Sequence, residues 1–257
     1  MLPSLGDDVL LGHSGFYSVY VAGQQVGGSL SITNPDASLE ILSGSSLDLY
    51  GDLVAEGSVV VNPKGLDDAS TLRFMADATL GGGGGMRLVP GGDGSSMIEV
   101  AGGATLTLGE SQRITGGGRF VGDVDVRGVV IADDRSGGIS FADGRVDLHG
   151  ALIAGFDSGF SLDQVEFTMH DGAEIVLGGT GSELILSTSE LHNVHLELAE
   201  GSLLHLPATG RPRYSDDVEF IGSVIEGRIE ILNYEDLHVH SSRIVDGEIL
   251  MRVPEAS

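Results

Sequence analysis

Short apolar triads, abundant glycine and scarce aromatic residues together predict an all-β fold, a parallel β-helix (β-solenoid) of roughly ten coils. The triads alternate inward and outward side chains, as in Leu30-Ser31-Ile32 and Val124-Asp125-Val126. This alternation is the period of a strand and not of a helix. The 257 residues include 41 glycines and only 5% aromatic residues, with no tryptophan. A narrow core of Val, Ile and Leu with glycine at the corners accounts for that composition.

An antiparallel sandwich is the competing β architecture. Asp143-Gly144, Asp171-Gly172 and Asp246-Gly247 are turn signals of the hairpin kind. The triads, however, are shorter and more numerous than the strands of a sandwich. Three triads at intervals of roughly 8 to 10 residues add up to a coil of about 20 to 30 residues, which is typical of a β-helix.

The N-terminal region, residues 9–62, contains the most regular triads, and Asn62-Pro63-Lys64-Gly65 closes it with a turn signal. A glycine-rich stretch, 79–95, follows and marks a possible internal seam. Its run from Gly81 to Gly85 is interpreted as a tight corner and not as a linker, because apolar triads resume on both sides without a polar spacer. We therefore expect residues 1–257 to form a single β-solenoid domain.

The second half, from about residue 140, keeps the same rhythm with fewer glycines. Its strands include Val146-Asp147-Leu148 and Leu237-His238-Val239-His240. The longest tract with few glycines, Glu183 to Glu200, also alternates and does not follow a 3.6-residue period. No helix is predicted anywhere in the chain.

Charge restricts the partners. The chain has 38 acidic and 13 basic residues, and its net charge is -25. Such a surface repels nucleic acid and anionic membranes, so both are excluded. No apolar stretch approaches the ~20 residues of a membrane span. Met1-Leu2-Pro3-Ser4 lacks the features of a secretory signal, so we expect a fragment without its signal peptide.

Several N-terminal segments resemble the repeat units of large secreted bacterial β-helix proteins, namely autotransporter passenger domains and filamentous-haemagglutinin-like adhesins. The segments are Tyr17 to Gly23, Val26 to Ile32, Ala37 to Ile41, Ser46 to Leu49 and Gly116 to Val124. The resemblance covers about the first 155 residues well and the remainder in rhythm only. It implies a right-handed solenoid, an extracellular or cell-surface location and a structural or adhesive role. Polysaccharide lyases and hydrolases use the same scaffold, so fold alone does not choose between these functions.

Adjacent acidic residues are the features closest to a catalytic site. They occur at Asp7-Asp8, Asp67-Asp68, Asp133-Asp134 and Asp216-Asp217. Asp133-Asp134-Arg135 is the most enzyme-like, because its arginine suits an acidic sugar. Neighbours on a strand nevertheless point to opposite faces, and paired aspartates are common in turns. The Asn-Thr-Asp signature of pectinolytic β-helix enzymes is missing, so no catalytic residue is predicted.

Histidines and acidic corners are the candidate metal ligands in the sequence. His238 and His240 would share one strand face, as in a two-ligand zinc or copper site. His192 and His195 would share a face only in a helix. Gly91-Gly92-Asp93-Gly94 begins like a calcium-binding β-roll repeat but is not repeated in tandem. A solvated polar ladder explains the histidines equally well, so no metal or cofactor is predicted beyond weak calcium binding.

These observations favour an extracellular structural or adhesive module that presents a rigid acidic surface to a glycan, a surface protein or another copy of itself. The first alternative is a carbohydrate-active enzyme, a polysaccharide lyase or glycoside hydrolase. The second is an oligomeric fibre or spike, in which outward-facing Phe156, Phe160 and Tyr214 would form the subunit contact.

Overall fold

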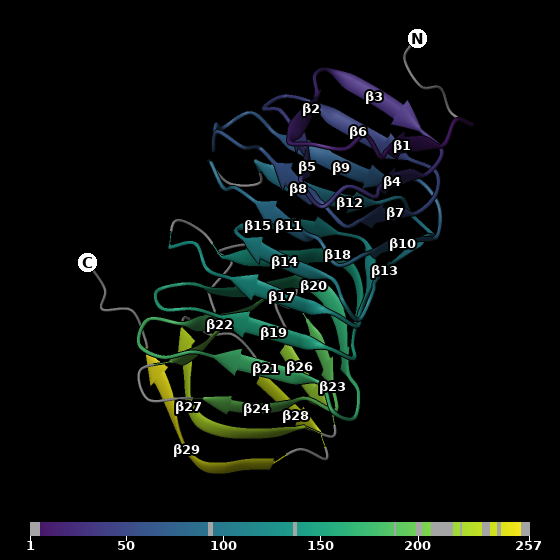
Figure 1. The fold of residues 1–257 in the computed structure, drawn as a ribbon. Coiled ribbons are helices and arrows are strands. Elements are labelled where there is room, and N and C mark those ends of the chain that lie inside the picture. Colours follow the sequence, from purple (N-terminus) through teal and green to yellow (C-terminus); the bar gives the residue numbers. More distant parts are fainter. Residues whose placement is uncertain are drawn as a thin grey trace.

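The computed structural model describes residues 6–91, 95–135, 138–187, 189–198, 202–206, 218–221, 223–232, 237–240 and 243–252. All strand pairs in this part of the chain are parallel, and they form one 29-stranded sheet wound into a solenoid (Figure 1). The described residues contain no helix, and so none that could cross a membrane. The predicted all-β parallel solenoid is confirmed.

Each coil has three sides, which we call faces A, B and C in chain order. Face A consists of β1 (Val9–Leu11), β4 (Leu30–Ile32), β7 (Leu53–Ala55), β10 (Ala78–Gly81), β13 (Thr105–Leu108), β16 (Asp123–Val126), the second halves of β18 (Ile139–Leu148) and β20 (Gly159–Met169), β23 (Glu190–His192), β26 (Val218–Ile221) and β28 (Leu237–His240). Face B consists of β2 (Tyr17–Val21), β5 (Ala37–Ile41), β8 (Ser58–Val61), β11 (Gly85–Leu88), β14 (Arg113–Gly116), β17 (Val129–Ala132), β19 (Ala151–Ala154), β21 (Glu174–Leu177), β24 (His195–Leu198) and the first halves of β27 (Val224–Leu232) and β29 (Arg243–Arg252).

Face C completes each coil. It consists of β3 (Gln24–Gly27), β6 (Ser46–Leu49), β9 (Ser70–Phe74), β12 (Ser96–Val100), β15 (Gly118–Val121), the first halves of β18 and β20, β22 (Glu183–Ser187), β25 (Leu203–Leu206) and the second halves of β27 and β29. Coil length varies: partners one coil apart are separated by 18 residues at Leu106 and Val124, and by 29 at Leu191 and Phe220. The number of coils is close to the ten that were predicted.

The core is a continuous column of inward-facing triad residues. Leu53 pairs with Leu80, and Leu80 with Leu108, so that identical side chains stack along the axis. On face C, the rings of Phe120 and Phe141 stack at 4.9 Å between centroids. Stacked burial of this kind removes apolar surface from water in every coil, and neighbouring coils depend on one another for it.

One predicted surface residue belongs to this core. Phe160 is 1% exposed and pairs with Ile139 and Leu184, so the expectation that it faces outward is wrong. The alternation of β20 places Phe160 and Leu162 on the inner side of face C. Phe156 is 53% exposed, as expected, and Tyr214 lies outside the described residues.

Corners between faces are very tight. Gly122, Asp143 and Gln164 occupy the corner from face C to face A in three successive coils, with φ of 100°, 55° and 56°. A single residue in the left-handed region turns the chain there, so β18 and β20 continue around the corner without a loop. The run from Gly81 to Gly85 forms the corner from β10 to β11, where Gly82 has a φ of 105°.

Buried serines satisfy backbone groups at the corner from face B to face C. Hydroxyl groups of Ser70, Ser96, Ser158 and Ser202 donate hydrogen bonds to backbone carbonyls there. Because an unpaired buried carbonyl is costly, these serines contribute to corner stability although they carry no apolar surface.

Candidate functional site: the polar face

Face A carries an outward-facing row of polar side chains, which we call the polar ladder. One residue per coil extends the row, and the strand register places each above the last. Its members are Asp8, Ser29, Asp52, Thr79, Thr107, Asp125, Asp147, Thr168 and His192. Strands in one sheet are ~4.8 Å apart, so the ladder offers a hydroxyl, carboxylate or imidazole at about that interval.

Some carboxylates of face A hold the coils together. Asp8 accepts hydrogen bonds from the backbone N–H and the hydroxyl group of Ser29, one coil further on. These bonds lower the pKa of Asp8, the hydroxyl having the larger effect. Asp52 accepts the backbone N–H of Thr79 at 2.7 Å in the same way. Acidic residues at these positions therefore accept hydrogen bonds from the following coil and also face solvent.

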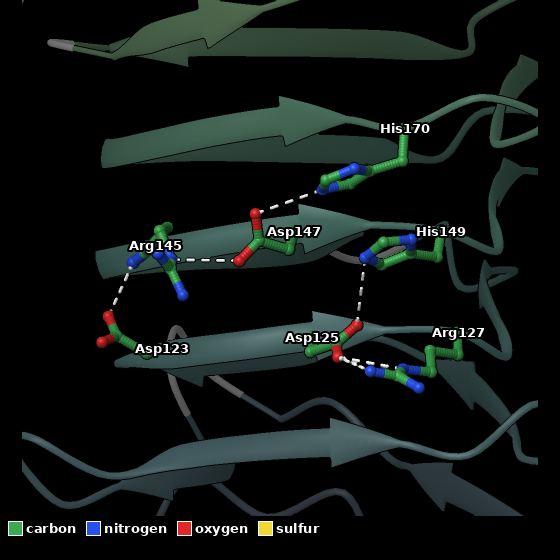
Figure 2. Close-up of polar contacts among 7 residues, drawn as sticks. All are labelled: Asp123, Asp125, Arg127, Arg145, Asp147, His149 and His170. Carbon is green, nitrogen blue, oxygen red and sulfur yellow. Dashed lines mark hydrogen bonds and ion pairs between the residues drawn. The ribbon is translucent and has the colours of Figure 1, made fainter.

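The ladder is richest in contacts around β16, β18 and β20, where six side chains form what we call the His–Asp–Arg cluster (Figure 2). The members of the cluster are Asp125, Arg127, Arg145, Asp147, His149 and His170. The Nε and one terminal nitrogen of Arg127 donate to Oδ2 of Asp125 at 2.9 and 2.8 Å. His149 Nε2 lies 3.8 Å from the other oxygen, Oδ1, of Asp125.

The next coil repeats this arrangement. Arg145 Nε lies 3.0 Å from Oδ2 of Asp147, and His170 Nε2 lies 3.4 Å from Oδ1 of the same carboxylate. Each carboxylate thus faces an arginine and a histidine, and the histidine comes from the coil that follows (Figure 2).

The two imidazoles are stacked. The ring centroids of His149 and His170 are 3.8 Å apart, and their planes differ by 10°. They form one wall of a hollow of about 710 Å³ at the corner from face A to face B. His195 and Asn193 from the next coil line the same hollow.

The acids of the cluster are half-buried, and its arginines are exposed. The side chains of Asp125 and Asp147 are 14% and 21% exposed, whereas those of Arg127 and Arg145 are each 51% exposed. Hydrogen bonds to Asp125, together with the charge of that carboxylate, raise the pKa of Arg127. The outermost atoms of this site are therefore guanidinium and imidazole nitrogens, which are hydrogen-bond donors on an otherwise acidic protein.

The acid and the arginine of the most enzyme-like segment of the sequence, Asp133 and Arg135, contact different residues. Asp133 and Arg135 lie in the corner after β17. Asp133 faces Arg87 at 3.9 Å, and the guanidinium of Arg135 lies over the ring of Phe156, 5.5 Å from its centroid. Asp133 and Arg135 therefore have separate partners.

The histidines considered as metal ligands are also separated. His192 ends β23 on face A and lies 2.9 Å from Glu190, whereas His195 begins β24 on face B. His238 and His240 are in β28, whose side chains lie outside the described part of the structure, as do residues 92–94 of the turn from Gly91 to Gly94. In the described part of the chain, no three His, Asp or Glu side chains are grouped as a metal site.

Comparison of the chain with known protein families, curated proteins and solved structures found no match. The His–Asp–Arg cluster was not predicted from the sequence. A signal for it exists: Asp125-Val126-Arg127 and Asp147-Leu148-His149 repeat an acid–apolar–base pattern after 22 residues, which is one coil.

Proposed function

We propose that the chain is a structural or adhesive module of an extracellular or cell-surface protein, and that face A binds an extended glycan. The observation that carries this proposal is the polar ladder, which presents hydrogen-bonding groups in register on successive coils. The resemblance of the N-terminal repeats to secreted bacterial β-helix adhesins supports the same setting.

A repeating ligand suits this surface physically. Each residue of the polar ladder supplies one or two weak polar contacts. A polymer that is bound to one of these residues is held close to the ladder residue of the next coil. The solenoid fixes the ladder residues in advance, so little side-chain or backbone ordering opposes binding. The donors of Arg127 and Arg145 favour acidic or hydroxyl-rich sugars at the centre of the face.

Binding as a function of polymer length tests this proposal. We expect the affinity for acidic and neutral polysaccharides, measured by calorimetry, to increase with the number of sugar units. Thr107→Val and Thr168→Val each remove one hydroxyl group from the ladder and should weaken binding by about 5- to 10-fold, the effect of one polar contact. Ser140→Ala, an outward substitution on face C, is the matched control and should leave the affinity unchanged.

Two results would contradict the proposal: an affinity that does not depend on polymer length, or a Ser140→Ala variant that loses as much affinity as the ladder variants.

Carbohydrate cleavage is the second candidate, and the His–Asp–Arg cluster is the observation that favours it. A carboxylate paired with an imidazole beside exposed arginines is an arrangement used for acid–base chemistry on sugars. If this site is catalytic, incubation with polysaccharide shortens the polymer, and His170→Ala abolishes the shortening. Binding that leaves polymer length unchanged supports the adhesive module instead.

A further inference from the structure

Face B carries an outward-facing apolar patch. Outward positions of a sheet that faces solvent are ordinarily occupied by polar side chains. Val129 and Ile131 of β17, Ala151 and Ile153 of β19, and Val176 of β21 form a compact block of five side chains. Val176 is 41% exposed, and the other four are half-buried. Figure 1 shows β14, β17, β19 and β21 side by side along the rod. A contiguous apolar patch with a polar border is typical of a protein–protein interface.

The two ends of this patch carry opposite charges. In one column of the register, Arg113 pairs with Val129, Val129 with Ala151, and Ala151 with Glu174. Arg113 and Glu174 are both exposed, and within the described ranges neither forms a salt bridge. The apolar pair in the middle is therefore flanked by a cation one coil before and an anion one coil after.

We propose that face B is the interface of an antiparallel homodimer. A two-fold axis parallel to the strands, midway between β17 and β19, would bring the two faces together. It would place Val129 opposite Ala151 of the second copy and Ile131 opposite Ile153. The same axis brings Arg113 opposite Glu174 of the second copy, and it does so twice.

Self-complementarity identifies the occupant as a second copy of this chain. An isologous dimer needs one surface that matches itself after a two-fold rotation, and the order cation, apolar pair, anion has this property. A two-fold axis parallel to the rod would instead place Arg113 level with Arg113 of the second copy, and Glu174 level with Glu174. Like charges at these positions disfavour that arrangement.

The net charge of -25 on each copy opposes association at long range. At 0.15 M salt the Debye length is about 8 Å, which screens charges far from the interface more than those in direct contact. This inference goes beyond the proposed function and leaves face A free, so dimerisation and glycan binding are measured independently.

A charge exchange tests the geometry. At about 100 µM protein and 0.15 M salt, we expect light scattering to show a dimer for the unaltered chain. Arg113→Glu and Glu174→Arg each place like charges at both contacts and should weaken dimerisation at least tenfold. Mixing the two variants restores opposite charges at both contacts, so the mixture should form a heterodimer although both chains remain acidic.

Controls separate this effect from misfolding and from general charge effects. Lys64→Glu changes the charge of an exposed residue in the corner between β8 and β9, outside the apolar patch and its two charged contacts, and should not alter dimerisation. Ile153→Asp should yield a monomer with the circular dichroism spectrum of the unaltered chain. A monomeric unaltered chain would overturn the proposal. So would a dimer that tolerates both charge variants, or a mixture that remains monomeric.

Discussion

At the scale of single residues, two adjacent glycines at one corner have very different surroundings. A Cβ atom added at Gly84 would overlap the backbone carbonyl oxygen of Gly57 in the preceding coil, whereas one added at Gly85 would have no heavy atom within 4 Å. The corner from β10 to β11 thus needs a glycine at 84 because the coils approach each other there, and not because of local backbone conformation.

Gly84→Ala should therefore reduce the free energy of unfolding by about 1–3 kcal/mol, the usual cost of overpacking. Gly85→Ala should change it by no more than about 0.5 kcal/mol, or raise it slightly by restricting the unfolded chain. Urea unfolding of the two variants measures the difference. Equal destabilisation of both would show that the close approach of the coils does not limit this corner.

The same scale shows what sequence reasoning missed at the candidate site. Asp125 and His149 are 24 residues apart in the sequence. Their contact can be predicted only if the length of the coil between them is known. Coil length varies along the chain, because corners range from single residues to longer loops, and no local pattern fixes it. The sequence therefore indicates His238 and His240, which are close in sequence, as a pair, and gives no comparable signal for the stacked pair of His149 and His170.

At the scale of elements, the strands were predicted well because a period of two is a local property. The triads of β4, β5, β13 and β16 alternate as expected. Corners were predicted less well. Asp143-Gly144 gave a turn signal of the hairpin kind but turns the chain within a parallel solenoid, and Gln164 turns the chain with no glycine or proline beside it. The outward placement predicted for Phe160 was wrong although the signal was local, because Phe160-Ser161-Leu162 alternates like the other triads, whose apolar members face inward.

Face C offers a test of how charged rows contribute to strand stacking. Arg73 on β9 lies between Asp48 on β6 and Glu99 on β12, with nitrogen–oxygen distances of 3.0 and 2.9 Å. Its pKa is raised, chiefly by the hydrogen bond to Glu99. Asp48 is only 6% exposed, so loss of Arg73 would leave a largely desolvated carboxylate that keeps its hydrogen bond from Gln24 but has no cation beside it.

Arg73→Met keeps the length of the side chain and removes its charge. We expect a loss of about 1–3 kcal/mol in the free energy of unfolding, in the range for hydrogen bonds to charged groups. Arg87→Met is the matched control: Arg87 faces Asp133 at 3.9 Å with half of its side chain exposed, so the loss should stay below about 0.5 kcal/mol. A cost for Arg87→Met equal to that for Arg73→Met would contradict this ranking.

At the scale of the whole molecule, the rod concentrates negative charge on a surface with few cations. The 38 acidic residues outnumber the 13 basic ones, and some of these cations, such as Arg73 and Arg127, are already paired. Repulsion among the remaining carboxylates favours the unfolded chain, in which the same charges lie further apart. Added salt should weaken this repulsion more than it weakens short, partly buried ion pairs.

The melting temperature should therefore rise with sodium chloride. Between 0.01 and 0.15 M the Debye length falls from about 30 to about 8 Å, and we expect a rise of about 2–6 °C, corresponding to roughly 1–2 kcal/mol for a chain of this size. Calcium chloride at the same ionic strength tests for weak calcium binding at the acidic corners. An additional rise with calcium, absent with magnesium, indicates bound ions, whereas equal curves indicate screening alone. A melting temperature that falls with salt would show that ion pairs of the Arg73 kind outweigh the net repulsion.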